Sequence, residues 1–358
     1  MKYQFEPRLE LASTLPPTCY TATDMLALET DKVFSRTWQL VGRVDQFSKP
    51  GDFLTATVAN EPVLIVRDQG GELRALSNVC RHRAGPVAAG AGNCRAFRCG
   101  YHGWTYGLDG RLLATPEFDG VEGFDKEKHG LPRFLLEVWQ GHVFVNLDEN
   151  AAALREFVGG IEVRAAQLDM KSCRFVERKD WYLDCNWKNY VDNYLEGYHV
   201  PVVHPRLNRE IDYSSYRTET GRFHSVQYSP IRRSASGGLG AGPDDSSAEA
   251  LYFWIFPNLM INVYPDNYST NLILPLGPER TLTVFEWFFR NPDDPQVRAR
   301  IRQAIEFSDE IQREDIAICE AVQRGLSSRT YEAGRYSVRR ESGVHHFHGL
   351  WSEFMSQP

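Results

Sequence analysis

The chain has 358 residues, of which 42% are hydrophobic and 24% charged, and its formal net charge at pH 7 is −7. This composition is typical of a globular protein, and the length suits two domains. The negative charge argues against nucleic acid or an anionic membrane as the main partner, and no apolar run is long enough to span a membrane. The first residues lack the apolar core of a signal peptide, and the seven scattered cysteines favour reduced thiols, so we expect a cytoplasmic protein.

The first part of the chain predicts a helix followed by short strands. Apolar positions at helical spacing predict a helix over residues 21–39. From Trp38 to Leu147 the sequence changes to short alternating runs separated by Gly, Asp and Asn, which is typical of strands. We therefore expect an all-β domain over 40–149, preceded by a helical segment over 1–39 that packs on the later domain.

Two metal-binding motifs lie within this all-β stretch. One is Cys-x-His, at Cys80 and His82, and the other is Cys-x-x-His, at Cys99 and His102. Zinc fingers pair like ligands, Cys with Cys and His with His, but here each motif supplies one of each. The mixed set favours a Rieske [2Fe–2S] centre, in which the cysteines bind one iron and the histidines the other. A structural zinc site is the alternative.

The remainder, 150–358, predicts an α+β domain with an antiparallel sheet packed on a long helix. Pro201 is expected to end the second helix of this domain, and the Gly- and Ser-rich stretch 234–249 predicts a flexible loop. The predicted helices cover 154–168, 186–200 and 295–326, and the predicted strands cover 173–182, 252–256, 259–263, 269–274 and 281–289.

A second candidate metal site involves two histidines of this domain. His199 lies at the end of the predicted helix, and His204 follows the break at Pro201. On an unbroken helix a five-residue step would turn the two rings about 140° apart, so the break allows them to converge. Two histidines and one carboxylate form the facial triad of non-haem Fe(II) oxygenases, which leaves positions open for dioxygen. Taken alone, such a pair is more often a hydrogen-bonded surface or core pair.

The third ligand of this site is sought on the helix over 295–326. Asp315 falls on its apolar stripe, where a carboxylate is costly to bury unless it is paired or bound to metal; the other members of the stripe are Ile311, Ile318, Cys319 and Val322. Asp315 is therefore the candidate, with a buried ion pair to an Arg as the alternative. The neighbouring Glu314 is expected to point away from this stripe.

With both motifs in view, the chain resembles the oxygenase component (α subunit) of the Rieske non-haem iron oxygenases over nearly its whole length. The stretches that carry a further resemblance, to the branch with choline monooxygenase and betaine or carnitine oxygenases, are 252–262, 271–278 and 319–326. The resemblance implies a helix-grip (START/Bet v1-like) catalytic domain and Fe(II) held by His199, His204 and Asp315. Glu196 occupies the position of the family's carboxylate bridge between the two iron sites. Many members have Asp there; the alternative role is a solvated helix residue.

The resemblance also implies the reaction and the partners. Dioxygen and electrons from a separate flavin- or iron–sulfur-containing, NAD(P)H-dependent reductase would be used to hydroxylate a small substrate, by mono- or dioxygenation. In a homotrimer, electrons would pass from one subunit's cluster through His102, Glu196 and His199 to the iron of its neighbour. The best candidate substrate is a quaternary ammonium compound, which could be hydroxylated or N-demethylated. An aromatic compound is the alternative, and a non-catalytic electron carrier is a more distant one.

Aromatic residues of the second domain suit a cationic substrate, because ring faces attract cations. The candidates are Tyr252, Trp254, Tyr264 and Phe285, although aromatics in sheets are more often core residues. Three late histidines, His345, His346 and His348, are not assigned to either metal site, and for these we expect surface or interface packing.

Overall fold

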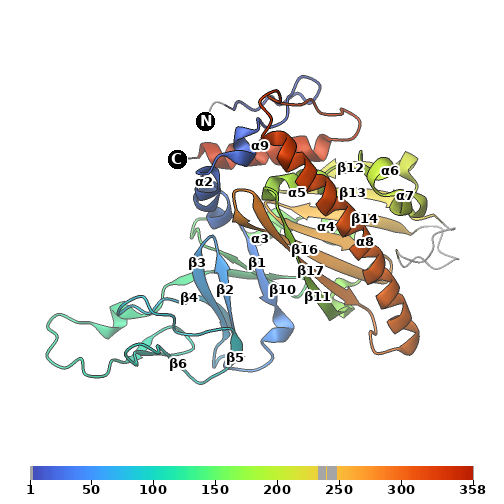
Figure 1. Ribbon diagram of the computed structural model, residues 1–358. Coiled ribbons are helices and arrows are strands. Elements are labelled where there is room, and N and C mark those ends of the chain that lie inside the picture. Colours follow the sequence, from blue (N-terminus) through green and yellow to red (C-terminus); the bar gives the residue numbers. More distant parts are fainter. Residues whose placement is uncertain (1–2, 233–238, 240–247, 358) are drawn as a thin grey trace. The chain divides into compact units, whose positions relative to one another are not determined.

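The computed structural model describes residues 3–232, 239 and 248–357, so the stretch expected to be a flexible loop, 234–249, lies almost wholly outside the described residues. The chain forms two compact units, of which one contains Thr30–Leu154 and the other Met1–Glu29 with Arg155–Pro358 (Figure 1). In the part of the chain that is described, no helix has the length and apolar character needed to cross a membrane.

The unit of residues 30–154 is built from antiparallel strands. Seven of them form a sheet in the order β1-β10-β9-β4-β3-β2-β5, and three form a small sheet, β6-β7-β8. The strands are β1 (Gln39–Arg43), β2 (Asp52–Val58), β3 (Glu61–Arg67), β4 (Leu73–Ser77), β5 (Ala91–Asn93), β6 (Phe97–Arg98), β7 (Thr105–Tyr106), β8 (Leu112–Ala114), β9 (Arg133–Trp139) and β10 (His142–Asn146), and short 3₁₀ turns cover Phe34–Arg36, Val44–Gln46 and Lys126–His129.

Strand β3 shows how this unit positions its cysteine loops. Successive side chains of a strand point to opposite faces, and both faces of β3 are buried. Val63 and Ile65 belong to one hydrophobic core. Leu64 and Val66 face the other core, which also contains Cys80 and Cys99. The cysteines are therefore anchored in packed apolar side chains.

The second unit contains most of the helices and a second seven-stranded sheet, in the order β11-β17-β16-β15-β14-β13-β12 with every pair antiparallel. The strands are β11 (Arg174–Leu183), β12 (Arg217–Thr220), β13 (His224–Pro230), β14 (Glu249–Ile255), β15 (Leu259–Val263), β16 (Asn267–Gly277) and β17 (Arg280–Phe289). The helices of the chain are α1 (Thr18–Thr21), α2 (Met25–Lys32), α3 (Leu154–Val158), α4 (Ile161–Arg164), α5 (Trp187–Tyr194), α6 (Val200–Val203), α7 (Pro205–Glu210), α8 (Pro295–Leu326) and α9 (Ser342–Ser356), with 3₁₀ turns at Met170–Ser172 and Tyr213–Ser215.

Helix α8 crosses one face of this sheet (Figure 1). It starts where the sequence predicts, because Asp294 caps the amide of Gln296 and Pro295 occupies the first turn. The fold class is confirmed: an all-β unit and a unit with an antiparallel sheet around a long helix. The stripe predicted on α8 is only partly correct, since Asp315 and Cys319 are buried but Ile318 and Val322 are exposed.

Two predicted helices are broken in the structure. Instead of one helix over 21–39, α2 ends at Lys32 and β1 begins at Gln39. The hydroxyl of Thr37 donates to the carbonyl of Val33, a local bond that competes with helix continuation. The helix expected over 154–168 is divided into α3 and α4 at Gly160, whose φ of +86° only glycine adopts readily.

The C-terminal helix α9 corrects two further expectations. Surface or interface packing was expected for His345 and His348, but both are buried within the unit, and Nε2 of His348 is 2.9 Å from Oδ1 of Asp192. Trp254 does not line the cavity described below. It is completely buried, and its ring lies 5.4 Å from that of Phe347 on α9.

Candidate iron sites

The two cysteine motifs form tight loops of similar design. The amide of Cys80 donates to the carbonyl of Gly85 at 2.8 Å, and the amide of Cys99 donates to that of Trp104 at 2.9 Å. Both thiols are buried, with 3% and 4% of each residue exposed. A Cβ on Gly85 would lie only 3.2 Å from Sγ of Cys99, so a side chain there would crowd the cysteine pair.

The two histidines of these loops face each other at the end of the same core. The ring centroids of His82 and His102 are 4.6 Å apart, and His82 stacks on Trp104 at 4.8 Å. Nδ1 of His82 is buried without a hydrogen-bond partner, which fits a metal ligand. Burial, and then the charges of His102 and Arg83, lower the pKa of His82, so its ring stays neutral as metal binding requires. His102 is exposed. These residues fit a two-thiolate, two-imidazole centre.

The segment that carries the other two histidines is not the single helix expected over 186–200. Helix α5 ends at Tyr194, and the carboxylate of Glu196 then accepts hydrogen bonds from the amides of Tyr198 and His199. These bonds replace helical ones and form a turn. Pro201 lies in the first turn of the next helix, α6, where its missing N–H costs nothing.

His204 occupies the short link between α6 and α7, directly before Pro205. A residue before proline avoids helical dihedrals, and His204 adopts φ −116° and ψ 70°. This kink turns its ring toward α8. The break expected at Pro201 is therefore wrong: Pro201 lies within α6, and the chain leaves helical geometry at His204.

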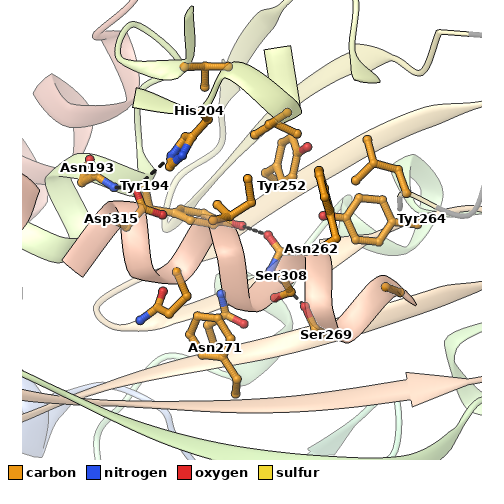
Figure 2. Close-up of a pocket in the computed structure, with 18 of the residues that line it drawn as sticks. Asn193, Tyr194, His204, Tyr252, Asn262, Tyr264, Ser269, Asn271, Ser308 and Asp315 are labelled. Atoms are coloured by element: carbon orange, nitrogen blue, oxygen red, sulfur yellow. Dashed lines mark hydrogen bonds and ion pairs between the residues drawn. The ribbon is translucent and has the colours of Figure 1, made fainter. Parts of the chain in front are cut away.

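The structure brings His199, His204 and Asp315 together, with one donor atom of each lying within 4.8 Å of the others. Figure 2 shows two of them, His204 and Asp315, directed toward each other. Nε2 of His204 is 3.0 Å from Oδ1 of Asp315, and Nε2 of His199 is 3.8 Å from the same oxygen. The side-chain amide of Asn193 donates to this oxygen at 2.7 Å. This contact was not predicted from the sequence. Two imidazoles and one carboxylate with this convergence suit a non-haem iron.

Each histidine also contacts a second carboxylate through its other nitrogen. Oε1 of Glu196 lies 2.6 Å from Nδ1 of His199, as expected from their spacing. Oε2 of Glu314 lies 2.6 Å from Nδ1 of His204. Glu314 points away from the helix stripe that contains Asp315, as predicted. Its contact with His204 was not predicted from the sequence. Burial alone would lower the pKa of His204, but Asp315 and Glu314 together raise it.

A cavity of about 120 Å³ adjoins these residues, between α8 and the sheet. Its wall includes one row of paired strand residues, Tyr252, Asn262, Ser269 and Trp287. Tyr194 donates to Asn262, which donates to Ser269 (Figure 2). Asn267, Ser269 and Asn271 occupy every second position of β16 and line the cavity. Polar residues at every second position of a buried strand indicate a polar cavity wall, although this pattern was not recognised in the sequence.

The cavity is rich in tyrosine and poor in positive charge. Tyr190, Tyr194, Tyr216, Tyr252 and Tyr264 line it, and burial raises the pKa of each phenol well above its usual value, so all five are neutral. Among the described lining residues none is Lys or Arg, while Glu196 and Asp315 supply carboxylates. Neutral ring faces beside carboxylates favour the binding of a cationic ligand.

A thiolate–imidazole centre in an all-β unit, and a two-histidine, one-carboxylate site with a cavity in an α+β unit, define the class of iron–sulfur-dependent non-haem iron oxygenases. Comparison with known proteins supports this class. The Rieske [2Fe-2S] domain family matches residues 37–125, and the family described as ring hydroxylating alpha subunit (catalytic domain) matches residues 170–357.

Three relatives show how far the similarity extends. Chloroplastic choline monooxygenase of Arabidopsis thaliana is 37% identical over 97% of this chain and 84% of its own length. The carnitine monooxygenase oxygenase subunit of Acinetobacter baumannii is 32% identical over 95% of this chain and 93% of its own. A solved quaternary ammonium Rieske monooxygenase superposes with a TM-score of 0.87 at 30% identity, over 98% of this chain and 97% of that one.

The chain therefore belongs to the Rieske non-haem iron oxygenases. It is an enzyme, with a Rieske [2Fe–2S] domain and a mononuclear-iron catalytic domain. The family, the fold class and both cofactors expected from the sequence are confirmed. The structural zinc site and the non-catalytic electron carrier are excluded by the same matches.

Proposed function

We propose that this chain is the oxygenase component of a monooxygenase that hydroxylates a quaternary ammonium compound, with electrons from a separate NAD(P)H-dependent reductase. The main observation behind this proposal is the cavity beside the triad, whose described lining residues include five neutral tyrosines and two carboxylates but no Lys or Arg. A quaternary ammonium group has no N–H to donate a hydrogen bond, so it is bound by aromatic ring faces and nearby negative charge.

The proposed ligands follow from the contacts above. Cys80, Cys99, His82 and His102 hold the [2Fe–2S] cluster, and the triad of His199, His204 and Asp315 holds the mononuclear iron. Glu196 is the bridging carboxylate, because it contacts His199 through Nδ1 while its backbone turn fixes the ring. The proposed domains are 1–39, 40–149 and 150–358, which the matched ranges support.

When bound, the two iron centres supply dioxygen reduction and insertion of one oxygen atom into a C–H bond, the other atom leaving as water. The chain's own residues prepare this chemistry. The tyrosine faces hold the ammonium group within reach of the triad, and Asn193 fixes the carboxylate of Asp315. The row of paired strand residues forms part of the cavity wall.

Within quaternary ammonium compounds, the cavity favours a choline-like alcohol over a carnitine-like carboxylate. A carboxylate tail would need a cation, and the described lining offers amides and hydroxyls instead, among them Asn262, Asn271 and Ser269. These groups suit a neutral hydroxyl.

We further propose a cytoplasmic homotrimer. The exposed ring of His102 would give one subunit's cluster access to its neighbour's site, and inter-subunit electron transfer is described for the solved quaternary ammonium Rieske monooxygenase. All seven cysteines, which lie in the described residues, are free of disulfides, as a reducing compartment requires.

Metal analysis tests the ligand sets. Anaerobically purified protein should contain three irons and two acid-labile sulfides per chain, the sum of one [2Fe–2S] cluster and one mononuclear iron. The Asp315→Ala variant should keep both sulfides and fall to two irons. Two irons in both proteins, even after added Fe(II), would contradict the triad.

Substrate-dependent oxygen consumption, measured with a reductase and NAD(P)H, tests the substrate class. Choline should be the best substrate, with L-carnitine weaker and the uncharged carbon isostere 3,3-dimethylbutan-1-ol weakest. A preference for the isostere or for benzoate would reject a cation-binding cavity and favour an aromatic or neutral substrate.

A further inference from the structure

Glu314 lies beside the proposed iron ligands without being one of them. Its Oε2 is 2.6 Å from Nδ1 of His204, and its side chain is 29% exposed against 2% for that histidine. The next residue, Asp315, faces the other ring nitrogen, Nε2, at 3.0 Å. His204 is thus held between two consecutive carboxylates of α8, one at each ring nitrogen.

Helix geometry explains why only one of these carboxylates faces the cavity. Consecutive residues of an α-helix point about 100° apart, so Asp315 lines the cavity while Glu314 does not. A ring placed against the side of the helix can still touch both residues. The kink before Pro205 puts the His204 ring in that position.

The same contact pattern occurs at the other histidine. Glu196 contacts Nδ1 of His199 at 2.6 Å, and Nε2 of this ring lies on the Asp315 side at 3.8 Å. A neutral imidazole that donates from Nδ1 keeps its lone pair on Nε2. Both outer carboxylates therefore select the same tautomer, with Nε2 of each ring directed toward Asp315.

Charge supports a role for Glu314 in metal binding. Three carboxylates, those of Glu196, Glu314 and Asp315, contact only two imidazoles. No Lys or Arg is found among the described residues that line the adjoining cavity. The excess of negative charge in a largely buried site suits a divalent cation.

We propose that Glu314 is a positioning residue, which fixes the orientation and tautomer of His204 so that Nε2 is presented to the mononuclear iron. This inference rests on the proposed ligand set of His199, His204 and Asp315. Glu314 contacts neither the cavity nor the proposed iron directly and acts through the histidine.

The test compares Glu314→Gln and Glu314→Leu with a matched control, Glu320→Gln. Glu320 lies on the same helix and accepts a hydrogen bond from the amide of Asp184, away from the triad. Each full-length protein, with its cluster intact and its mononuclear iron removed, is titrated anaerobically with Co(II) against a competing chelator. Sulfide content and melting temperature are measured on the same samples.

The Leu variant should bind Co(II) about 10- to 100-fold more weakly, as for other partners of metal-bound histidines. The Gln variant keeps a neutral acceptor and should fall between Leu and native, while the control should bind as the native protein does. If both Glu314 variants bound Co(II) with native affinity, the proposal would be overturned. It would also be overturned if the loss of Co(II) affinity were accompanied by equal losses of sulfide content and thermal stability. Failure of the native protein to bind Co(II) would instead contradict the ligand set itself.

Discussion

At the residue scale, Glu196 contacts His199 through both the ring and the backbone. Its Oε1 lies 2.6 Å from Nδ1 of the ring. The backbone between the two residues is a turn, because the carboxylate of Glu196 also accepts hydrogen bonds from the amides of Tyr198 and His199. One carboxylate therefore both ends the helical region and orients the ring.

Tyr252 gives a prediction about cation binding. Its ring lies between Tyr216 and Tyr264, with centroids at 6.5 and 6.3 Å. Replacing it by Leu should weaken choline binding about tenfold, because an aromatic face contributes roughly 1 to 2 kcal/mol to a desolvated cation. The Phe variant should bind nearly as the native protein does. Calorimetric dissociation constants are the measurement.

The control ligand for this series is 3,3-dimethylbutan-1-ol, which has the shape of choline without its charge. Its affinity should change little in the Leu variant. If the alcohol and choline lost affinity equally, packing and not the ring's attraction for a cation would explain the effect.

His142 gives a prediction about pH. Burial, with a smaller effect of Arg43, lowers the pKa of this histidine from 6.5 to about 4. Below pH 6.5 the unfolded chain takes up a proton that the folded chain does not, so stability falls as the pH decreases and levels off near pH 4. Between pH 7 and pH 5 this single residue should cost about 2 kcal/mol.

The measurement is the melting temperature of the native protein and of His142→Gln at both pH values. The variant should lose several degrees less than the native protein on acidification, since about 1 kcal/mol corresponds to roughly 2 to 4 °C in a unit of this size. Identical losses would show that the histidine is not neutral in the fold.

At the element scale, a buried ion pair joins helices α2, α5 and α9. The side chains of Lys188 and Glu29 are completely buried and paired. Glu29 also accepts hydrogen bonds from the indoles of Trp187 and Trp351, each at 2.8 Å. The N-terminal segment is thereby attached to the helix that leads to Glu196.

Removing one partner of this pair should be more harmful than removing both. Glu29→Leu leaves a buried ammonium uncompensated and should cost about 3 to 5 kcal/mol, whereas Glu29→Leu with Lys188→Met should recover much of this loss. Thermal unfolding of the two variants is the measurement. A double variant less stable than the single one would show that the uncompensated charge of Lys188 is not the cause of the loss.

At the scale of the whole molecule, the two proposed iron sites differ in how they hold metal. The cysteines of the cluster are anchored in a hydrophobic core, while the triad borders a cavity. A chelator should therefore remove the mononuclear iron and leave the cluster's visible absorption unchanged. Added Fe(II) should restore both iron content and activity. Parallel loss of cluster absorption and mononuclear iron would contradict this independence.

Local patterns in the sequence were enough to predict the chemistry of the chain. The mixed Cys and His motifs identify the cluster type, because ligand identity and spacing are local properties. Helix α8 was predicted at its observed bounds, because Asp294 directly before it, Pro295 at its start and its long periodic pattern are all local signals. The strands around Val63 and Ile261 were likewise recognisable from short apolar runs bounded by turns.

The contact between Glu314 and His204, and the lining of the cavity, depend on how distant segments pack and could not be predicted. Glu314 and Asn193 reach the site because α5, α8 and the His204 kink converge there, and no local pattern encodes the distance between segments more than 100 residues apart. The cavity wall depends on strand register, which pairs Tyr252 with Asn262 and Asn262 with Ser269. Register is determined by packing across the whole sheet, so it cannot be predicted from the sequence of a single strand.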